Sequence, residues 1–403
     1  MASKTIHVRP GAKSRANDAL AVMTSAFTND DPAYFTTHQM KDPAWSPDQT
    51  RLLEVGGATV AHLWVADRTM RYGDARIPFG GIADVCTHPD HRRRGYCGRL
   101  LDEAIAMMAK AKQPLSVLFT GSPEVYQSRG WHVVPGEWVS AKVPSGQLAE
   151  AGGISVRPFE GADLDDVLRV YQEINAHKVG PLDRSPAYWR AMQEWLPLND
   201  DGGQVFFDVI VHVRTVVGYG ITVLQRKNLR ILDAGIESDV LGPSLLRAWQ
   251  THASEHGAKT IDGALSHNHP MFPVLERHAA ATIKPRSGVM MRLNSLRGVL
   301  DAVQPELQRR RRRVAPLSGP TFAIRVGDEH VRLELPIAKV IVAAAKGDEP
   351  EVPLRPDQFL HLLMGLDSGH EALKSLKLPA NVQVYVQRLF PNTGFDYWLA
   401  DAF

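Results

Sequence analysis

The hydrophobic positions in the first 150 residues follow two different periods. Alternating or continuous apolar residues predict strands over 58–67, 77–89 and 115–120. Between the last two strands, residues 95–111 carry apolar side chains on one helical face, namely Leu100, Leu101, Ala104, Ile105 and Met108. A strand, a turn, a helix and a strand in this order indicate an α/β fold.

The segment from about residue 151 repeats this order. A strand and then a helix are expected over 154–174, with Asp163 as the helix N-cap. The next elements are strands over 206–213, 216–224, 229–236 and 260–265 and a helix over 242–257. We interpret the two segments as a weak internal duplication.

The last segment is predicted to be a small α+β unit. Strands are expected within 321–336 and over 381–390, and a helix over 355–365. The apolar run 337–345 predicts a buried strand. The chain ends on FDYWLADAF, which holds too many large apolar groups for a loose tail.

Composition narrows the class of protein. A chain of 403 residues is long enough for two or three domains, and 44% hydrophobic with 22% charged residues is ordinary for a globular protein. The net charge of +2 argues against bulk binding of nucleic acid, so anion recognition must come from local clusters. Two cysteines are no disulfide framework, and there is neither a signal-peptide core nor an apolar run of roughly 18 residues. We therefore expect a cytoplasmic protein without membrane or nucleic-acid partners.

One local cluster does point to an anion. In VCTHPDHRRRGYC (85–97) a strand ends, three arginines and a glycine follow, and a helix begins. A helix N-terminus holds phosphate well, Arg92, Arg93 and Arg94 add positive charge, and Gly95 allows close approach of the backbone. The end of the strand can offer backbone groups to an extended ligand that carries amides. Coenzyme A, a pyrophosphate joined to a pantetheine arm, fits all these features.

The same residues resemble the acetyl-CoA signature of the GNAT N-acetyltransferases, Arg/Gln-x-x-Gly-x-Gly/Ala. Arg92 to Tyr96 match its first five positions, and Cys97 departs from it at the sixth. The strand before, the helix after and LFT…VYQSRGW in the next strand and helix extend the match. The whole chain resembles the Eis-like (enhanced intracellular survival) branch of that superfamily.

This resemblance implies a domain organisation. Residues 1–150 are expected to form a catalytic GNAT domain that binds acetyl-CoA, and 151–293 a degenerate second GNAT domain. The second copy has SDVLGPSLL (238–246), without an arginine before its helix. Residues 294–403 are expected to form an α+β domain like sterol carrier protein, whose C-terminus reaches the active site.

The resemblance also assigns roles in acetyl transfer. The backbone of Val85, Cys86 and Thr87 is expected to hold the pantetheine, and Arg92, Arg93, Arg94, Gly95 and Tyr96 the pyrophosphate. Tyr126 is the expected general acid for the leaving thiolate, unless it only packs against the core. The terminal carboxylate of Phe403 is the expected base, with Asp401 as the alternative. Cys86 is expected to make a backbone contact rather than act as a nucleophile, so the amine attacks the thioester directly.

The acceptor site is less defined by the sequence. Asp30, Asp31, Tyr34 and Phe35 could bind a cationic amine, or could be an N-capping pair and ordinary core aromatics, and Asp84 should lie near the acetyl group. The resemblance implies aminoglycosides, polyamines or lysine ε-amines as acceptors, and a homo-hexamer. The alternative function is a module that senses acetyl-CoA and binds an apolar ligand without turnover.

Two further patterns are given little weight. The pairs His88/His91 and His267/His269 lack further ligands at a recognisable spacing, so no metal is expected. The run Arg309–Arg313 could grip nucleic acid or an acidic partner, but a solvated helix end or linker is the preferred interpretation.

Overall fold

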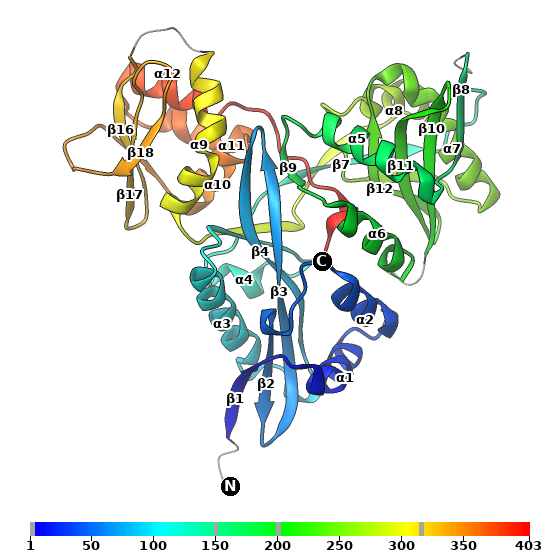
Figure 1. Ribbon diagram of the computed structural model, residues 1–403, viewed down its shortest axis with the longest axis horizontal. Coiled ribbons are helices and arrows are strands. Elements are labelled where there is room, and N and C mark those ends of the chain that lie inside the picture. The colour runs from blue at the N-terminus through cyan, green and yellow to red at the C-terminus, as the bar shows by residue number, and fades with distance from the viewer. Residues whose placement is uncertain (1–4, 149–151, 199–202, 314–317) are drawn as a thin grey trace.

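The computed structural model describes residues 5–148, 152–198, 203–313 and 318–403, which form three lobes (Figure 1). Each lobe is built on its own sheet, and we call them the first, second and third lobes in chain order. The last residues of the chain leave the third lobe and return to the centre, where the C-terminus lies near α2 and α6 (Figure 1). The mixed α/β character predicted from the sequence is confirmed.

The first sheet has the strand order β1–β2–β3–β4–β5–β15–β6, and β9 pairs with the outer part of β3. Alternate side chains of its strands face opposite sides, so Leu52 packs in one hydrophobic cluster and Leu53 in another. Helices α1 and α2 cover the side of Leu52, and α3 covers the side of Leu53. The elements are β1 (Ile6–Pro10), α1 (Ala16–Ala26), α2 (Pro32–Lys41), β2 (Thr50–Val55), β3 (Ala58–Tyr72), β4 (Ala75–Thr87), α3 (Tyr96–Lys110), β5 (Leu115–Phe119), α4 (Glu124–Gln127), β6 (His132–Val133), β9 (Val179–Leu182) and β15 (Val289–Leu293).

The second sheet repeats the pattern with the order β14–β7–β13–β12–β11–β10–β8. The two sheets exchange strands across residue 150, since β7 belongs to the second sheet and β15 inserts between β5 and β6 of the first. The elements are β7 (Gly136–Lys142), β8 (Ile154–Pro158), α5 (Leu164–Ile174), α6 (Pro186–Trp195), β10 (Gln204–His212), β11 (Thr215–Gln225), β12 (Asn228–Ile236), α7 (Gly242–Glu255), β13 (Thr260–Gly263), α8 (Met271–Ala279) and β14 (Thr282–Arg286).

The third lobe is a small sheet of order β18–β17–β16–β19 packed against helices. The predicted strand over 381–390 is wrong, because Ala380–Leu389 form helix α12. The residues buried there, Val382, Val386 and Leu389, have helical spacing, while Val384 is 44% exposed. The elements are α9 (Leu296–Arg312), β16 (Thr321–Val326), β17 (Glu329–Glu334), β18 (Ile341–Ala344), β19 (Glu351–Leu354), α10 (Pro356–Leu363), α11 (Asp367–Ser375) and α12.

The apolar run 337–345 is also less buried than predicted. Only Ile341–Ala344 form a strand, β18, which lies at the edge of the sheet. Ile337 and Ile341 are among the exposed large hydrophobic residues. A run of this length gives no period by which a buried strand can be told from an edge strand.

The expectation of a solvated helix end or linker at Arg309–Arg313 is wrong for its middle residues, because Arg310 and Arg311 are buried in contacts with other segments. The long β3–β4 hairpin reaches α9, where the backbone N–H of Asp74 donates to Glu306 (3.1 Å). Glu306 accepts hydrogen bonds from Arg309 and Arg310, and Arg310 also donates to the Tyr72 hydroxyl (3.1 Å). Arg310 and Arg311 are 7% and 1% exposed. The carboxylate of Glu306, the hydroxyl of Tyr72 and the neighbouring helices surround these arginines. Their charges can therefore be buried.

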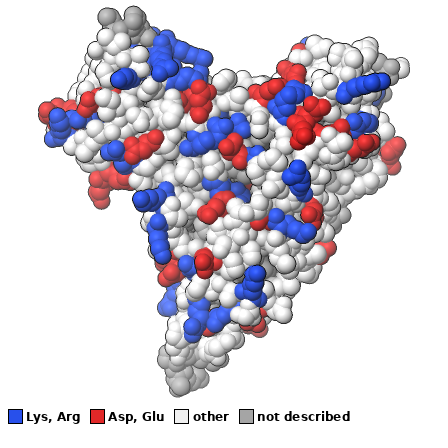
Figure 2. Space-filling model, viewed as in Figure 1, with Lys and Arg blue, Asp and Glu red and all other residues white. Residues whose placement is uncertain are grey.

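Charges are otherwise interspersed over the face seen in Figure 2, in keeping with the net charge of +2. Among the helices that the structure describes, none is long and apolar enough to cross a membrane.

Candidate active site

Strands β4 and β5 separate at the centre of the first sheet. They pair in parallel from Phe79–Leu115 to Ile82–Leu118, and β4 then continues to Thr87 while β5 ends at Phe119. The opposite edge of β4 stays bonded to β3 as far as Thr87. The edge of β4 that faces β5 is therefore open beyond Ile82, and its backbone groups are available to an extended ligand.

A local distortion of β4 accompanies this opening. The pairing with β3 is irregular between His62 and Trp64, opposite Asp84 and Val85, and Asp84 has φ 50°, in the left-handed region. The carbonyl of Asp84 can only accept, so Nδ1 of His62 donates to it (2.9 Å). His62 is fully buried, and burial lowers its pKa to about 4, so it is neutral. A strained, bonded bulge of this kind is typical of functional positions.

The arginine turn lies where the opening meets α3. Gly95 is the N-cap of α3 with φ 76°, and Arg93 has φ 61°. Arg92 donates to the carbonyl of Thr87 (3.2 Å), so the turn is tied to the end of β4. The first backbone N–H groups of α3 and the positive end of its dipole face this turn.

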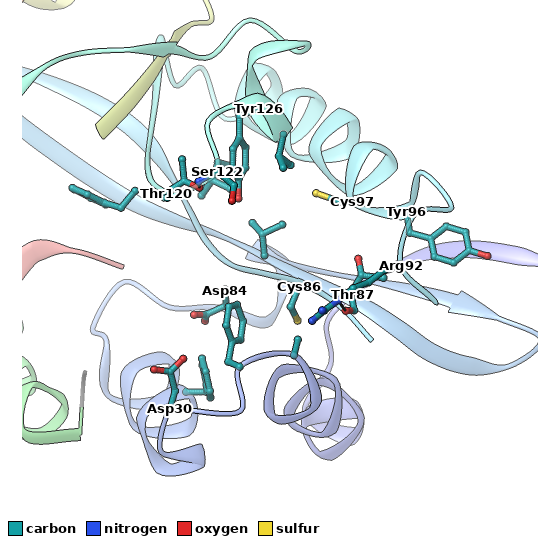
Figure 3. Close-up of a pocket in the computed structure, with 18 of the residues that line it drawn as sticks. Asp30, Asp84, Cys86, Thr87, Arg92, Tyr96, Cys97, Thr120, Ser122 and Tyr126 are labelled. Atoms are coloured by element: carbon teal, nitrogen blue, oxygen red, sulfur yellow. Dashed lines mark hydrogen bonds between the residues drawn. The ribbon is translucent and has the colours of Figure 1, made fainter. Parts of the chain in front are cut away.

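A cavity of about 800 Å³ occupies the opening (Figure 3). Its lining contains Val85, Cys86, Thr87, Arg92, Arg93, Gly95, Tyr96, Tyr126 and Phe403, which are all of the expected site residues except Arg94. Arg94 is exposed and donates to the carbonyl of Asp90 (3.0 Å), away from the cavity. The ring of Tyr96 is largely buried and packs in the cluster on the α3 side of the sheet.

Tyr126 and Asp84 lie on opposite sides of the cavity (Figure 3). Burial, and then the nearby Cys97, raise the pKa of Tyr126, so its hydroxyl keeps its proton at neutral pH. Burial also raises the pKa of Cys86 and of Cys97, which disfavours a thiolate at either position. The site therefore has a proton donor and no activated cysteine nucleophile.

The side opposite Tyr126 is acidic and aromatic. Asp30, Tyr34, Phe35 and Asp84 line the cavity. Gln39 of α2 donates to Asp84 (2.8 Å). Burial, with a smaller contribution from the charge of Asp30, raises the pKa of Asp84 to about 6, against the effect of the Gln39 hydrogen bond. Asp31, by contrast, is the N-cap of α2 and accepts from the backbone of Ala33 (2.8 Å), as the structural alternative predicted.

Phe403 reaches this cavity from the third lobe. Its ring lies against Gly81, where a Cβ would come within 2.5 Å of the ring, and near Phe119 (ring centroids 5.6 Å apart). Arg68 lies 5.7 Å from the ring centroid. The expectation that the last residues are ordered is confirmed, since Phe395, Tyr397, Trp398 and Ala400 are buried. Asp401 does not line the cavity; it is fully buried in ion pairs with Arg184.

Sequence reasoning missed several residues of the site. Gln39 and His62 act on Asp84 from distant segments, and Phe119, Thr120 and Ser122 line the cavity. No local pattern marks these residues. Gly81 did carry a signal, because a glycine inside a strand often marks a close approach by another segment.

The histidine pairs are engaged in ordinary contacts. His88 accepts from the backbone of Asp90 (3.3 Å), His267 bonds to Glu137, and His269 is buried against the carbonyl of Ala234 (3.1 Å). Within the described ranges there is no group of three or more His, Cys, Asp or Glu side chains that could hold a metal ion.

Comparison with known proteins agrees with this geometry. Residues 7–134 match the family model of the acetyltransferase (GNAT) domain. No curated protein sequence matches the chain. A GCN5-related N-acetyltransferase from Anabaena variabilis ATCC 29413 has 18% identity and a TM-score of 0.75, over 99% of this chain and 100% of that chain.

Two other solved structures are similar over the full length. A GCN5-related N-acetyltransferase from Kribbella flavida has 18% identity and a TM-score of 0.73, over 100% of this chain and 99% of that chain. Eis1 from Mycobacterium abscessus has 16% identity and a TM-score of 0.67, over 99% of this chain and 100% of that chain. At these identities the likeness concerns the fold.

The family match and the cavity together define the class of protein. The chain carries a GNAT acetyltransferase domain and is an acetyltransferase enzyme, which uses an acyl-CoA donor and an amine acceptor. The GNAT resemblance of the arginine turn is confirmed, and the Eis-like assignment stays a prediction.

Proposed function

We propose that this protein transfers the acetyl group of acetyl-CoA to primary amines of compounds that carry several amino groups, such as aminoglycosides, polyamines or lysine side chains. The observation that carries the proposal is one cavity with a cationic helix N-terminus at one end and Asp30, Asp84 and aromatic rings at the other. An anionic donor and a cationic acceptor would meet in the middle, where β4 is open.

Acetyl-CoA is a substrate here, and the residues fit it. Arg92, Arg93 and the N-terminus of α3 suit the pyrophosphate, and the open backbone edge at Val85–Thr87 suits the amides of pantetheine. The adenine end and its 3′-phosphate are not assigned to residues.

The reaction is direct attack on the thioester. The amine nitrogen bonds to the carbonyl carbon, the C–S bond breaks, and the thiolate takes the proton of the Tyr126 hydroxyl. The attacking amine passes its proton to the carboxylate of Phe403, directly or through water. The apolar contacts of the Phe403 ring with Gly81 and Phe119 support this placement.

The domain organisation belongs to the same proposal. The first lobe would be the catalytic GNAT domain, the second a GNAT-like domain without an arginine turn, and the third a unit like sterol carrier protein. A cytoplasmic homo-hexamer remains a prediction, to be tested by measuring the mass of the assembly in solution.

The first experiment measures release of CoA thiol from acetyl-CoA with aminoglycosides, polyamines and lysine peptides. It compares the chain that ends at Phe403 with one extended by a few residues. Turnover of multi-amine compounds that is lost on extension supports both the substrate class and Phe403 as the base. Turnover that survives extension removes Phe403 from the mechanism. Tight CoA binding without thiol release from any amine would instead favour the alternative, a module that senses acetyl-CoA.

A further inference from the structure

The second sheet has an opening like that of the first, and the chain's own C-terminal segment lies there. Strands β12 and β13 pair in parallel as far as Ile231–Gly263 and then separate. Residues Phe395–Leu399 line a small space together with Ala264, Leu265 and Ser266, which follow β13. His269 bonds to the carbonyl of Ala234 on β12 and packs on Trp398 (ring centroids 5.5 Å apart).

Arg184 joins this segment to the second sheet. Its Nε and Nη2 donate to the two carboxylate oxygens of Asp401 (2.7 and 2.8 Å), and its Nη1 donates to Asp233 of β12 (2.6 Å). The side chains of all three residues are inaccessible to solvent. The guanidinium carbon lies 4.4 Å from the ring centroid of Tyr171 and 4.6 Å from that of Trp189.

The charges in this network do not balance. One guanidinium faces two carboxylates, and burial raises the pKa of Asp233 to about 6, against the attraction of Arg184. Burying three charges is a weak device for stability, because their desolvation offsets most of the attraction. A bidentate bond between buried side chains does add geometric specificity, because two parallel N–H···O bonds fix the relative orientation of the two groups.

Asp401 is two residues from Phe403, so the chain between them spans at most about 7 Å. The backbone is held there as well, because the Tyr397 hydroxyl donates to the carbonyl of Asp401 (2.9 Å). Fixing Asp401 therefore limits where the ring and the carboxylate of Phe403 can lie in the cavity of the first sheet.

We propose that Arg184 is a positioning residue for acetyl transfer: it holds Asp401 in the opening of the second sheet, and so holds Phe403 at the acceptor end of the cavity in the first. This inference rests on the proposed function, because it needs Phe403 to act in catalysis. The second lobe would then serve as the receptor for the C-terminal segment.

The test uses Asp401→Asn, which keeps the shape and leaves Arg184 and Asp233 as a balanced pair, so the variant should fold. We expect kcat to fall at least tenfold with KM for acetyl-CoA unchanged, and faster hydrogen exchange of the amides of residues 399–403. Arg184→Lys keeps the positive charge but loses the bidentate bond. Its kcat should therefore lie between that of the unchanged chain and that of Asp401→Asn. The matched control is Asp208→Asn, a buried carboxylate of β10 bonded to His252 (3.0 Å), which should change neither readout.

A double-mutant cycle with the chain extended by a few residues, which removes the free carboxylate of Phe403, separates positioning from general loss of stability. If Arg184 and Asp401 act through the carboxylate of Phe403, Asp401→Asn should lower kcat little further in the extended chain. Equal fold losses in both backgrounds would overturn the proposal, as would faster exchange without loss of kcat. If the unchanged chain transfers acetyl to no amine, the proposed function fails. In that case hydrogen exchange alone tests whether Arg184 holds Asp401 in place. If Asp401→Asn left the exchange of the amides of residues 399–403 unchanged, this part of the proposal would be overturned as well.

Discussion

In the proposed mechanism, single residues in the cavity divide the proton chemistry between its two sides. Tyr126 sits where burial keeps its phenol protonated, and the carboxylates sit across the cavity from it. An acid for the leaving group and an acidic surface for an ammonium group need opposite protonation states at the same pH. Separating them across the width of one cavity meets both needs.

For Tyr126→Phe, we expect kcat to fall about 10²-fold, because the departing thiolate loses its proton donor. Binding of acetyl-CoA should not change, since the ring and its packing against Trp131 remain. Steady-state thiol release and calorimetric titration with CoA measure the two quantities. A variant that loses CoA binding together with turnover would assign Tyr126 to packing alone.

Asp84 is expected to trade stability for function. Its pKa rises from 3.8 to about 6 on folding, so the folded state holds the proton more tightly than the unfolded state. The buried negative charge of Asp84 lowers the free energy of unfolding. This loss is absent below pH 4, grows between pH 4 and 6, and is complete above pH 6. Asp84→Asn should therefore raise the free energy of unfolding by about 3 kcal/mol at pH 7.5, and leave it unchanged near pH 3.5.

The same substitution should lower kcat/KM for a cationic amine about tenfold, because the amine loses a counter-charge. Thermal melts at the two pH values and an acetylation assay test both parts. A lower melting temperature at pH 7.5 would show that Asp84 is held by favourable contacts and carries no cost.

At the level of elements, the first and second sheets show one geometry put to two uses. In each, a pair of parallel strands separates near the middle of the sheet. The first opening is flanked by the arginine turn and α3 and contains a large cavity. The second is flanked by α7, whose N-terminus has no arginine turn, and the C-terminal segment packs there. The opening without an arginine turn is therefore the one in which the C-terminal segment of the chain packs.

The arginine turn allows a matched comparison between neighbouring residues. Arg93 lines the cavity and Arg94 does not, although both are exposed arginines of the same turn. We expect Arg93→Gln to raise KM for acetyl-CoA about tenfold through loss of a charge-assisted bond to phosphate, and Arg94→Gln to change it less than twofold. The difference should shrink at high salt. Equal effects of the two variants would mean that only the net charge of the turn matters.

This turn was predictable from the sequence because its parts are contiguous. Arg92, Arg93 and Gly95 stand between a strand and a helix whose periods are plain, so local reasoning sufficed. Asp84 could be placed at the site by its position on the strand and Tyr126 by the family resemblance. Gln39 and His62 could not be placed, since they reach Asp84 only through the packing of α2 and β3. Helix α12 was missed because Val382, Val384 and Val386 also satisfy the period of a strand, and only burial tells the two apart.

For the whole molecule, contacts between distant segments hold the three lobes around the cavity. The exchange of β7 and β15 and the return of the C-terminal segment join residues more than 100 positions apart. Pairing over such distances leaves no period in the sequence. The arginine run is the clearest example of a feature that local sequence does not explain. Its role depends on the contact between α9 and the β3–β4 hairpin, which are far apart in the chain.

The contact between α9 and the hairpin depends on Glu306. Glu306 is inaccessible to solvent and accepts from Arg309, Arg310 and the backbone of Asp74. Burial by itself would raise the pKa of Glu306, but these hydrogen bonds and charges outweigh it and lower the pKa. Stability from Glu306 is therefore present above the unfolded pKa of 4.5 and is lost as the pH falls through the lower folded value.

Glu306→Gln leaves two arginines without their carboxylate, so we expect a loss of about 3 kcal/mol in the free energy of unfolding at pH 7. The loss should fall mainly on the transition that frees α9 from the hairpin, and should shrink at pH 3. Glu351→Gln is the control, because Glu351 pairs with Arg325 on the exposed surface of the same lobe, and a change within about 0.5 kcal/mol is expected. Calorimetric unfolding of both variants gives the comparison. Equal stability of Glu306→Gln and the unchanged chain would mean that the apolar contacts of α9 alone join the third lobe to the catalytic one.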